Sequence, residues 1–105
     1  MFGFLKSLFA PKIDMVLVEK LNSKPFLVDV RTPMEFSSGH PKGSVNIPLS
    51  SIGSNLDKFK NKKNIIVFCR SGNRSRQAAD ILRSKGIKDI YNGGSWQNVN
   101  KYLGQ

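Results

Sequence analysis

The sequence is poor in cysteine, histidine and acidic side chains. Its 105 residues include one Cys and one His, and seven Asp and Glu stand against 17 Lys and Arg. A single cysteine excludes an internal disulfide and a Cys-x-x-Cys redox pair, so the chain is not a disulfide-stapled secreted domain. One Cys and one His also cannot build a structural zinc site, which takes four ligands drawn mainly from these residues. We therefore expect no metal and predict a cytoplasmic protein.

Long apolar runs are missing as well. The longest central run, Ile65–Cys69, is far shorter than the ~20 residues that a membrane helix needs. Near the start of the chain, Phe2, Leu5 and Phe9 recur at helical spacing within Met1–Pro11. This segment is either an arm that packs on its own domain or a helix that contacts a membrane surface or a partner. Both alternatives stay open.

The formal net charge of +10 points to anionic partners. A small anion, a nucleic acid and an acidic lipid surface would all fit, and charge alone does not choose among them. We interpret the lysines of residues 58–63 as a solvated surface run before a turn. The sequence contains no aromatic and basic platform of the kind that binds single strands, so nucleic acid is disfavoured as a partner.

Short apolar runs alternate with amphipathic helical patterns along the rest of the chain. The expected strands lie near residues 26–30, 44–47, 64–69 and 89–91. The expected helices cover residues 13–21, a segment starting at Thr32, residues 52–59, 75–85 and 96–103, and Gly93-Gly94 is expected to turn the chain. The alternation predicts a three-layer α/β domain with a mainly parallel sheet of about five short strands between helices. We expect this domain over residues 13–105, preceded by an arm over residues 1–12.

The sharpest chemical feature is the segment Cys69–Ser75, which reads Cys-Arg-Ser-Gly-Asn-Arg-Ser. Cys69 ends the most apolar strand, at the edge where open α/β sheets bind ligands. Gly72 permits a tight turn, so several backbone N–H groups can converge beside a helix N-terminus. Such a cradle binds an anion and favours the thiolate of Cys69, while Arg70 and Arg74 add donors that suit oxyanions. We therefore predict that Cys69 is a nucleophile with a lowered pKa.

Four segments, in this order along the chain, resemble the rhodanese-like domain family. The segments are residues 27–36 (its Asp-x-Arg…Glu-Phe pattern), 39–48 (its Gly-His-x-x-Gly-Ala-x-Asn-Ile-Pro pattern), 67–75 (its active loop) and 93–96 (its closing Gly-Gly…Trp pattern). The closing pattern is shorter here, Pro41 stands where Ile is common, and Ser44 replaces Ala. The resemblance spans roughly residues 14–103.

The resemblance implies a single-domain sulfurtransferase without a cofactor. Cys69 would take a sulfane sulfur from a donor, become a persulfide and pass the sulfur on. The loop residues that would bind the donor are Arg70, Ser71, Gly72, Asn73, Arg74 and Ser75. Basic loops in this family tend to use thiosulfate, so the two arginines favour a thiosulfate-like anion. Because the chain has one Cys, the acceptor must come from outside: cyanide in an assay, or a thiol or protein in the cell.

Four further residues receive supporting roles. Asp29 and Arg31 follow a buried strand toward the edge that carries Cys69 and could brace its loop. An ion pair of Arg31 with Glu35 or with a helix end is an equal alternative. We interpret His40 as a structural hydrogen-bonding residue and Trp96 as a core residue.

Two other functions remain as alternatives. One is a non-catalytic binding module of the same fold, against which the retention of Cys69 with both arginines argues. The other is a phosphatase or arsenate reductase of related fold. Those enzymes carry a longer Cys-x5-Arg loop, whereas Cys69 and Arg74 form Cys-x4-Arg, and the sequence offers no evident proton donor for a leaving group.

Overall fold

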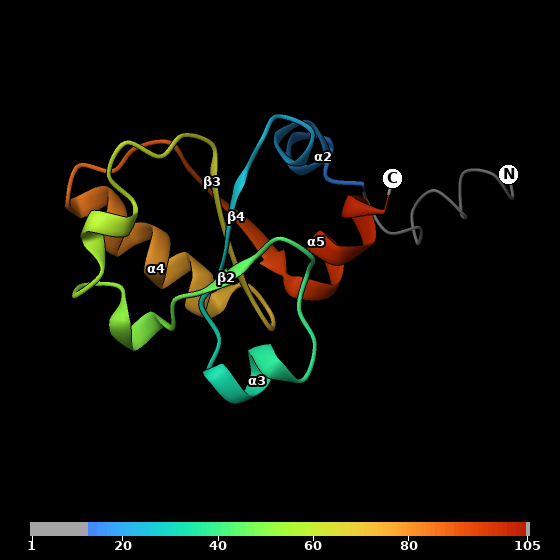
Figure 1. Cartoon of the computed structure of the whole chain (residues 1–105). Coiled ribbons are helices and arrows are strands. Elements are labelled where there is room, and N and C mark those ends of the chain that lie inside the picture. The colour runs from blue at the N-terminus through green and yellow to red at the C-terminus, as the bar shows by residue number, and fades with distance from the viewer. Residues whose placement is uncertain (1–12, 105) are drawn as a thin grey trace, which may run out of the picture.

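Four parallel strands form the sheet of the computed structural model, which describes residues 13–104 (Figure 1). The strands follow the order β2-β1-β3-β4 across the sheet, and all neighbours are parallel. Their bounds are β1 (Phe26–Asp29), β2 (Val45–Asn46), β3 (Ile65–Cys69) and β4 (Ile90–Ser95). The expected α/β class is confirmed, but the described residues form four strands and not about five. The expected arm over residues 1–12 lies outside the described residues.

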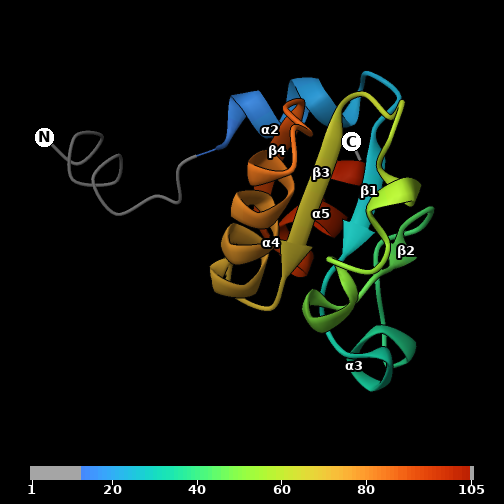
Figure 2. The same ribbon diagram turned by 90° about the vertical axis from the view of Figure 1, so that its left-hand side faces the viewer.

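Helices cover both faces of this sheet. Helix α4 (Asn73–Ser84) packs on one face, and α2 (Met15–Leu21) and α5 (Trp96–Leu103) pack on the other (Figure 2). The central strand β3 is buried throughout because its side chains alternate between the two layers. This explains its unbroken apolar sequence and confirms the predicted three layers. No helix between residues 13 and 104 is long and apolar enough to cross a membrane.

The helix expected over residues 13–21 is present and starts after Asp14, and the predicted helix start at Thr32 is confirmed. The Asp14 carboxylate accepts a hydrogen bond from the Leu17 amide at 3.0 Å and caps α2. Thr32 and Glu35 form a reciprocal capping box at the start of α3 (Pro33–Ser37). These caps are local signals, which is why the sequence alone reveals them.

The prediction of a helix over residues 52–59 is wrong. Two short 3-10 turns, η1 (Leu49–Ser51) and η2 (Leu56–Lys58), replace it. The side chains of Ser54 and Asn55 donate hydrogen bonds to the carbonyl of Ser51 and so compete with a regular helical ladder. The apolar spacing nevertheless predicted burial correctly, because the large apolar side chains of this segment point into the core.

The turn expected at Gly93-Gly94 is also wrong, since both glycines lie inside β4. Val67 pairs with Asn92 and Phe68 with Gly94, so a bulge inserts Gly93 between them. A Cβ on Gly93 would stand 3.0 Å from Ile66, which explains why this buried position holds a glycine. Helix α4 likewise starts at Asn73 and not near Ser75, so the turn that precedes it is shorter than expected.

Candidate active site

Cys69 lies at the carboxyl end of β3 and is 1% exposed. The chain then turns through Gly72, whose φ of +101° places it in the left-handed region and makes it the N-cap of α4. The turn brings the positive end of a 12-residue helix beside the sulfur. The predicted juxtaposition of a thiol, a tight loop and a helix N-terminus is thus present.

Hydrogen bonds from the loop converge on the sulfur. The Gly72 amide donates to Cys69 Sγ at 3.0 Å, and the Ser75 hydroxyl lies 3.4 Å from it. Burial raises the pKa of the Cys69 thiol. Hydrogen bonds from the Ser75 hydroxyl and from the amides of Ser75, Ser71 and Gly72 lower it by more, so the pKa lies below its ordinary value. The loop therefore stabilises the thiolate, which is the nucleophilic form.

We predict that Cys69 reacts with iodoacetamide at lower pH than free cysteine does, and that Ser75→Ala raises the pKa of Cys69. The variant removes a hydroxyl that donates to the charged sulfur, a bond worth ~1.5–3 kcal/mol at most. The pH dependence of the alkylation rate measures the shift. Ser84→Ala, at the exposed far end of α4, is the matched control. An identical pH midpoint in Ser75→Ala and the wild type would refute the assigned hydrogen bond.

Arg74 does not extend freely into the opening of the loop. Its guanidinium donates to both carboxylate oxygens of Glu35 on α3, at 2.7 and 3.0 Å. The bond from Arg74 is the main reason why the pKa of Glu35 falls to about 2. Arg74 therefore ties the first turn of α4 to α3, and it adds positive charge near the sulfur while its donor fork is already engaged.

Arg70 is the loop arginine that faces solvent. Its side chain is exposed and lines a depression of ≈ 380 Å³ together with Arg31 and Trp96. The guanidinium of Arg31 stacks 4.7 Å above the Trp96 ring. Trp96, expected in the core, is thus only partly buried: it packs against the α2 and α5 layer and also borders this depression.

Asp29 and Arg31 form a buried ion pair at the same edge of the sheet. Asp29 is 0% exposed and its carboxylate lies 2.6 Å from the Arg31 guanidinium, which also donates to the Gly39 carbonyl at 2.7 Å. The alternative pairing of Arg31 with Glu35 is not adopted. Within residues 13–104 neither side chain bonds to the loop of residues 70–75, so the pair fixes the surrounding segments and not the loop itself.

The sequence profile of the rhodanese-like domain matches residues 16–101. The chain belongs to the rhodanese-like domain family. It is 41% identical over 69 residues to the uncharacterized protein YqhL of Bacillus subtilis, covering 66% of this chain and 55% of that one. It is 38% identical over 103 residues to a putative mitochondrial thiosulfate sulfurtransferase of Schizosaccharomyces pombe, covering 79% of this chain and 72% of the relative. The chain thus spans only about half of the length of YqhL.

A solved human structure has a similar fold. It is the single-domain sulfurtransferase TSTD1, which superposes with a TM-score of 0.71 at 30% identity and covers 85% of this chain and 94% of its own. The parallel sheet flanked by helices is therefore the rhodanese fold.

His40 has a structural place in this rhodanese-like domain. Its ring stacks on Phe36 at 3.6 Å, and Nδ1 lies 2.7 Å from the Phe36 carbonyl. Since a carbonyl only accepts, Nδ1 is the protonated nitrogen. Within residues 13–104, no three His, Cys, Asp or Glu side chains come together in a way that could hold a metal ion.

Asn92 is the site residue of this rhodanese-like domain that the sequence did not reveal. Its Oδ1 accepts from the Gly94 amide at 2.9 Å, and its Nδ2 donates to the Gly72 carbonyl at 3.1 Å. Oδ1 also lies 2.7 Å from the Ser75 hydroxyl, whose single proton has Asn92 Oδ1 and Cys69 Sγ as alternative acceptors. The bulge in β4 aims Asn92 across to the loop. One polar side chain thus restrains both groups that donate to Cys69 Sγ. The only sequence signal was its position before the glycine pair.

We predict that Asn92→Asp raises the pKa of Cys69. The aspartate keeps the acceptor for Ser75, but it replaces the donor to the Gly72 carbonyl with an acceptor and places a negative charge beside the thiolate. Asn100→Asp, on the exposed side of α5, makes the same charge change away from the loop. The pH dependence of alkylation compares the two. Equal pH midpoints of alkylation for both variants would show that Asn92 does not influence the pKa of Cys69.

Proposed function

We propose that this chain is a sulfurtransferase that moves a sulfane sulfur from an anionic donor to an external acceptor through a persulfide on Cys69. The observation that carries the proposal is the hydrogen-bonded cradle around Cys69 Sγ, with the Gly72 amide at 3.0 Å and the Ser75 hydroxyl at 3.4 Å. Such a cradle lowers the pKa of the thiol and can stabilise the terminal sulfur of a persulfide through the same donors.

With thiosulfate as donor, the Cys69 thiolate attacks the outer sulfur. A sulfur–sulfur bond forms to Cys69, the sulfur–sulfur bond of thiosulfate breaks, and sulfite leaves with the bonding electron pair. In the second half, cyanide attacks the terminal sulfur, thiocyanate leaves, and the thiolate is restored. The total charge is unchanged in each half, and no proton or metal is needed.

Positive charge near the loop supports an anionic donor. A thiolate and thiosulfate repel each other, so the approach needs compensation from the loop amides, the helix N-terminus and the arginines. Arg70 is free to meet the donor because its side chain is exposed, whereas Arg74 supplies charge from its pair with Glu35. The exposed residues Ser71 and Asn73 contribute through their place on the loop.

The acceptor is external, because Cys69 is the only cysteine and no second thiol can resolve the persulfide. A thiol or a protein in the cytoplasm, where thiols stay reduced, completes the proposed cycle. Relatives named as thiosulfate sulfurtransferases support this class of reaction.

Thiocyanate formation from thiosulfate and cyanide tests the proposal. We expect turnover that saturates with thiosulfate. Hydrolysis of an aryl phosphate faster than sulfur transfer would instead favour the phosphatase of related fold. Binding of sulfur donors without any sulfur transfer would favour the non-catalytic module.

A further inference from the structure

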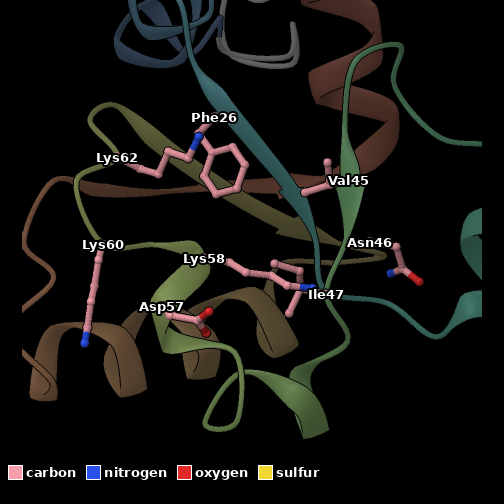
Figure 3. Close-up of a pocket in the computed structure, with 8 residues that line it drawn as sticks. All are labelled: Phe26, Val45, Asn46, Ile47, Asp57, Lys58, Lys60 and Lys62. Carbon is pink, nitrogen blue, oxygen red and sulfur yellow. The ribbon is translucent and has the colours of Figure 1, made fainter.

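A groove lies beside strand β2, between Val45 and Ile47, the ring of Phe26 on β1, and the lysine-bearing segment of residues 57–62 (Figure 3). Its volume is ≈ 420 Å³, and its floor consists of Phe26, Val45 and Ile47. Val45 is 41% exposed, so its side chain is accessible to a ligand. We call this feature the β2 groove. It is distinct from the depression beside Arg70 and Trp96, with which it shares no lining residue.

Lysines frame the β2 groove. Lys58 extends toward Ile47 from one side, and the Lys62 ammonium lies over the Phe26 ring, 4.9 Å from its centroid (Figure 3). Lys60 points away from the opening in the same view. Asp57 is the one acidic residue of the lining. Among the described residues these lysines have no ion-pair partner within 4.0 Å, so their charge is available to a ligand.

The β2 groove also has a direction. Strand β2 pairs with β1 on one side only, so its other edge has no strand partner among the described residues. Edge strands of this kind accept an extended segment from another chain. Beyond the end of β2, Pro48 and Leu49 line a smaller depression that also contacts Arg74, which borders the Cys69 loop. A segment running along β2 would therefore lead toward the loop.

We propose that the β2 groove binds an extended segment of a partner protein in which acidic and apolar side chains alternate. In such a segment one set of side chains faces the apolar floor, and the acidic set meets the ammonium groups of Lys58 and Lys62. We assign the partner as the protein that accepts the sulfur from Cys69, and this assignment rests on the proposed function. The groove and the chemistry of the segment that it would bind are argued independently of that function.

Other polyanions fit the β2 groove less well. The lining holds no arginine, the residue best suited to phosphate, and its one aromatic ring is covered by Lys62 and so cannot stack on a base. A lipid surface would need apolar side chains that protrude beyond the charges, but here they form the floor beneath the lysines.

The test uses the full chain with Cys69→Ser, so that no sulfur chemistry contributes, and a short fluorescent peptide of alternating Glu and Val. We expect low-salt binding in fluorescence anisotropy that weakens as salt rises, with NMR shift changes at Val45, Asn46 and Ile47. Lys58→Glu with Lys62→Glu should weaken binding about tenfold or more, since reversed rim charges repel the peptide. Lys20→Glu with Lys101→Glu, on α2 and α5, is the control of equal charge and should leave affinity unchanged.

Three results would overturn the proposal. Equal affinity for a peptide of alternating Glu and Ser would mean that the apolar floor does not bind. Equal loss in both pairs of charge reversals would mean that only net charge matters. Tighter binding of poly-uridine RNA or phosphatidylserine vesicles to the same residues would assign the groove to another class of partner. These binding measurements use a variant without Cys69. A failure to bind the peptide would therefore overturn the groove proposal without bearing on thiocyanate turnover by the wild type, which tests the proposed function.

Discussion

Cys69→Ser is expected to abolish thiocyanate formation, with a fall of at least about 10³-fold in turnover. The hydroxyl of serine stays protonated at neutral pH, and the loop donors that stabilise a thiolate cannot compensate for so large a difference in acidity. Serine is close to cysteine in size, so it fills the buried position at the end of β3 and the loop keeps its shape. The loss would therefore come from chemistry and not from unfolding.

Ser71→Ala provides the control for Cys69→Ser. Ser71 lies in the same loop, but its side chain is exposed and its amide is retained in alanine. We expect turnover within about threefold of the wild type, because alanine keeps the amide that bonds to Cys69 and removes only an exposed hydroxyl. Residual turnover of Cys69→Ser near that of Ser71→Ala would remove Cys69 from the mechanism.

Asp29→Ala is expected to cause the largest loss of stability, about 3 kcal/mol in the free energy of unfolding. The substitution leaves the 4% exposed Arg31 as a buried cation without its partner, and breaking one half of a buried pair costs ~3–5 kcal/mol. For a domain of this size, each lost kcal/mol lowers Tm by roughly 4–8 °C. Denaturant unfolding followed by circular dichroism measures the change.

Two comparisons make the Asp29 prediction specific. The exposed pair Arg83–Asp80 is 3.7 Å long, and Asp80→Ala should change the free energy of unfolding by less than about 1 kcal/mol. The double variant Asp29→Leu with Arg31→Met should be more stable than Asp29→Ala, because no buried charge remains unpaired. If Asp29→Ala and Asp80→Ala lowered the free energy of unfolding by the same amount, the buried pair would contribute no more to stability than a surface pair.

The chemical centre could be predicted because its parts are neighbours in the sequence. Cys69, Gly72 and Ser75 lie within one turn, so a strand end, a permissive glycine and a helix start sufficed to place them together. The caps at Asp14 and Thr32 are equally local. Short spacing therefore explains why the sequence alone could place these residues together.

The missed features join distant parts of the chain. The sequence did not reveal the pair of Arg74 with Glu35, which lies 39 residues earlier and 2.7 Å from the guanidinium. Asn92 reaches Gly72, 20 residues before it, only because β4 lies beside β3 and contains a bulge. Neither pairing has a periodicity or spacing that reveals it. The prediction of a helix over residues 52–59 is wrong for the opposite reason. Local side-chain hydrogen bonds compete with the helical backbone bonds there, although the apolar spacing correctly indicated which residues are buried.

Mass spectrometry of the wild-type protein after incubation with thiosulfate is the most direct test of the account. We expect a mass increase of one sulfur atom, located on the peptide that contains Cys69, and its loss with equimolar thiocyanate when cyanide is added. The same treatment of Cys69→Ser should leave the mass unchanged. Thiocyanate turnover by the wild type without any sulfur on Cys69 would contradict the persulfide mechanism.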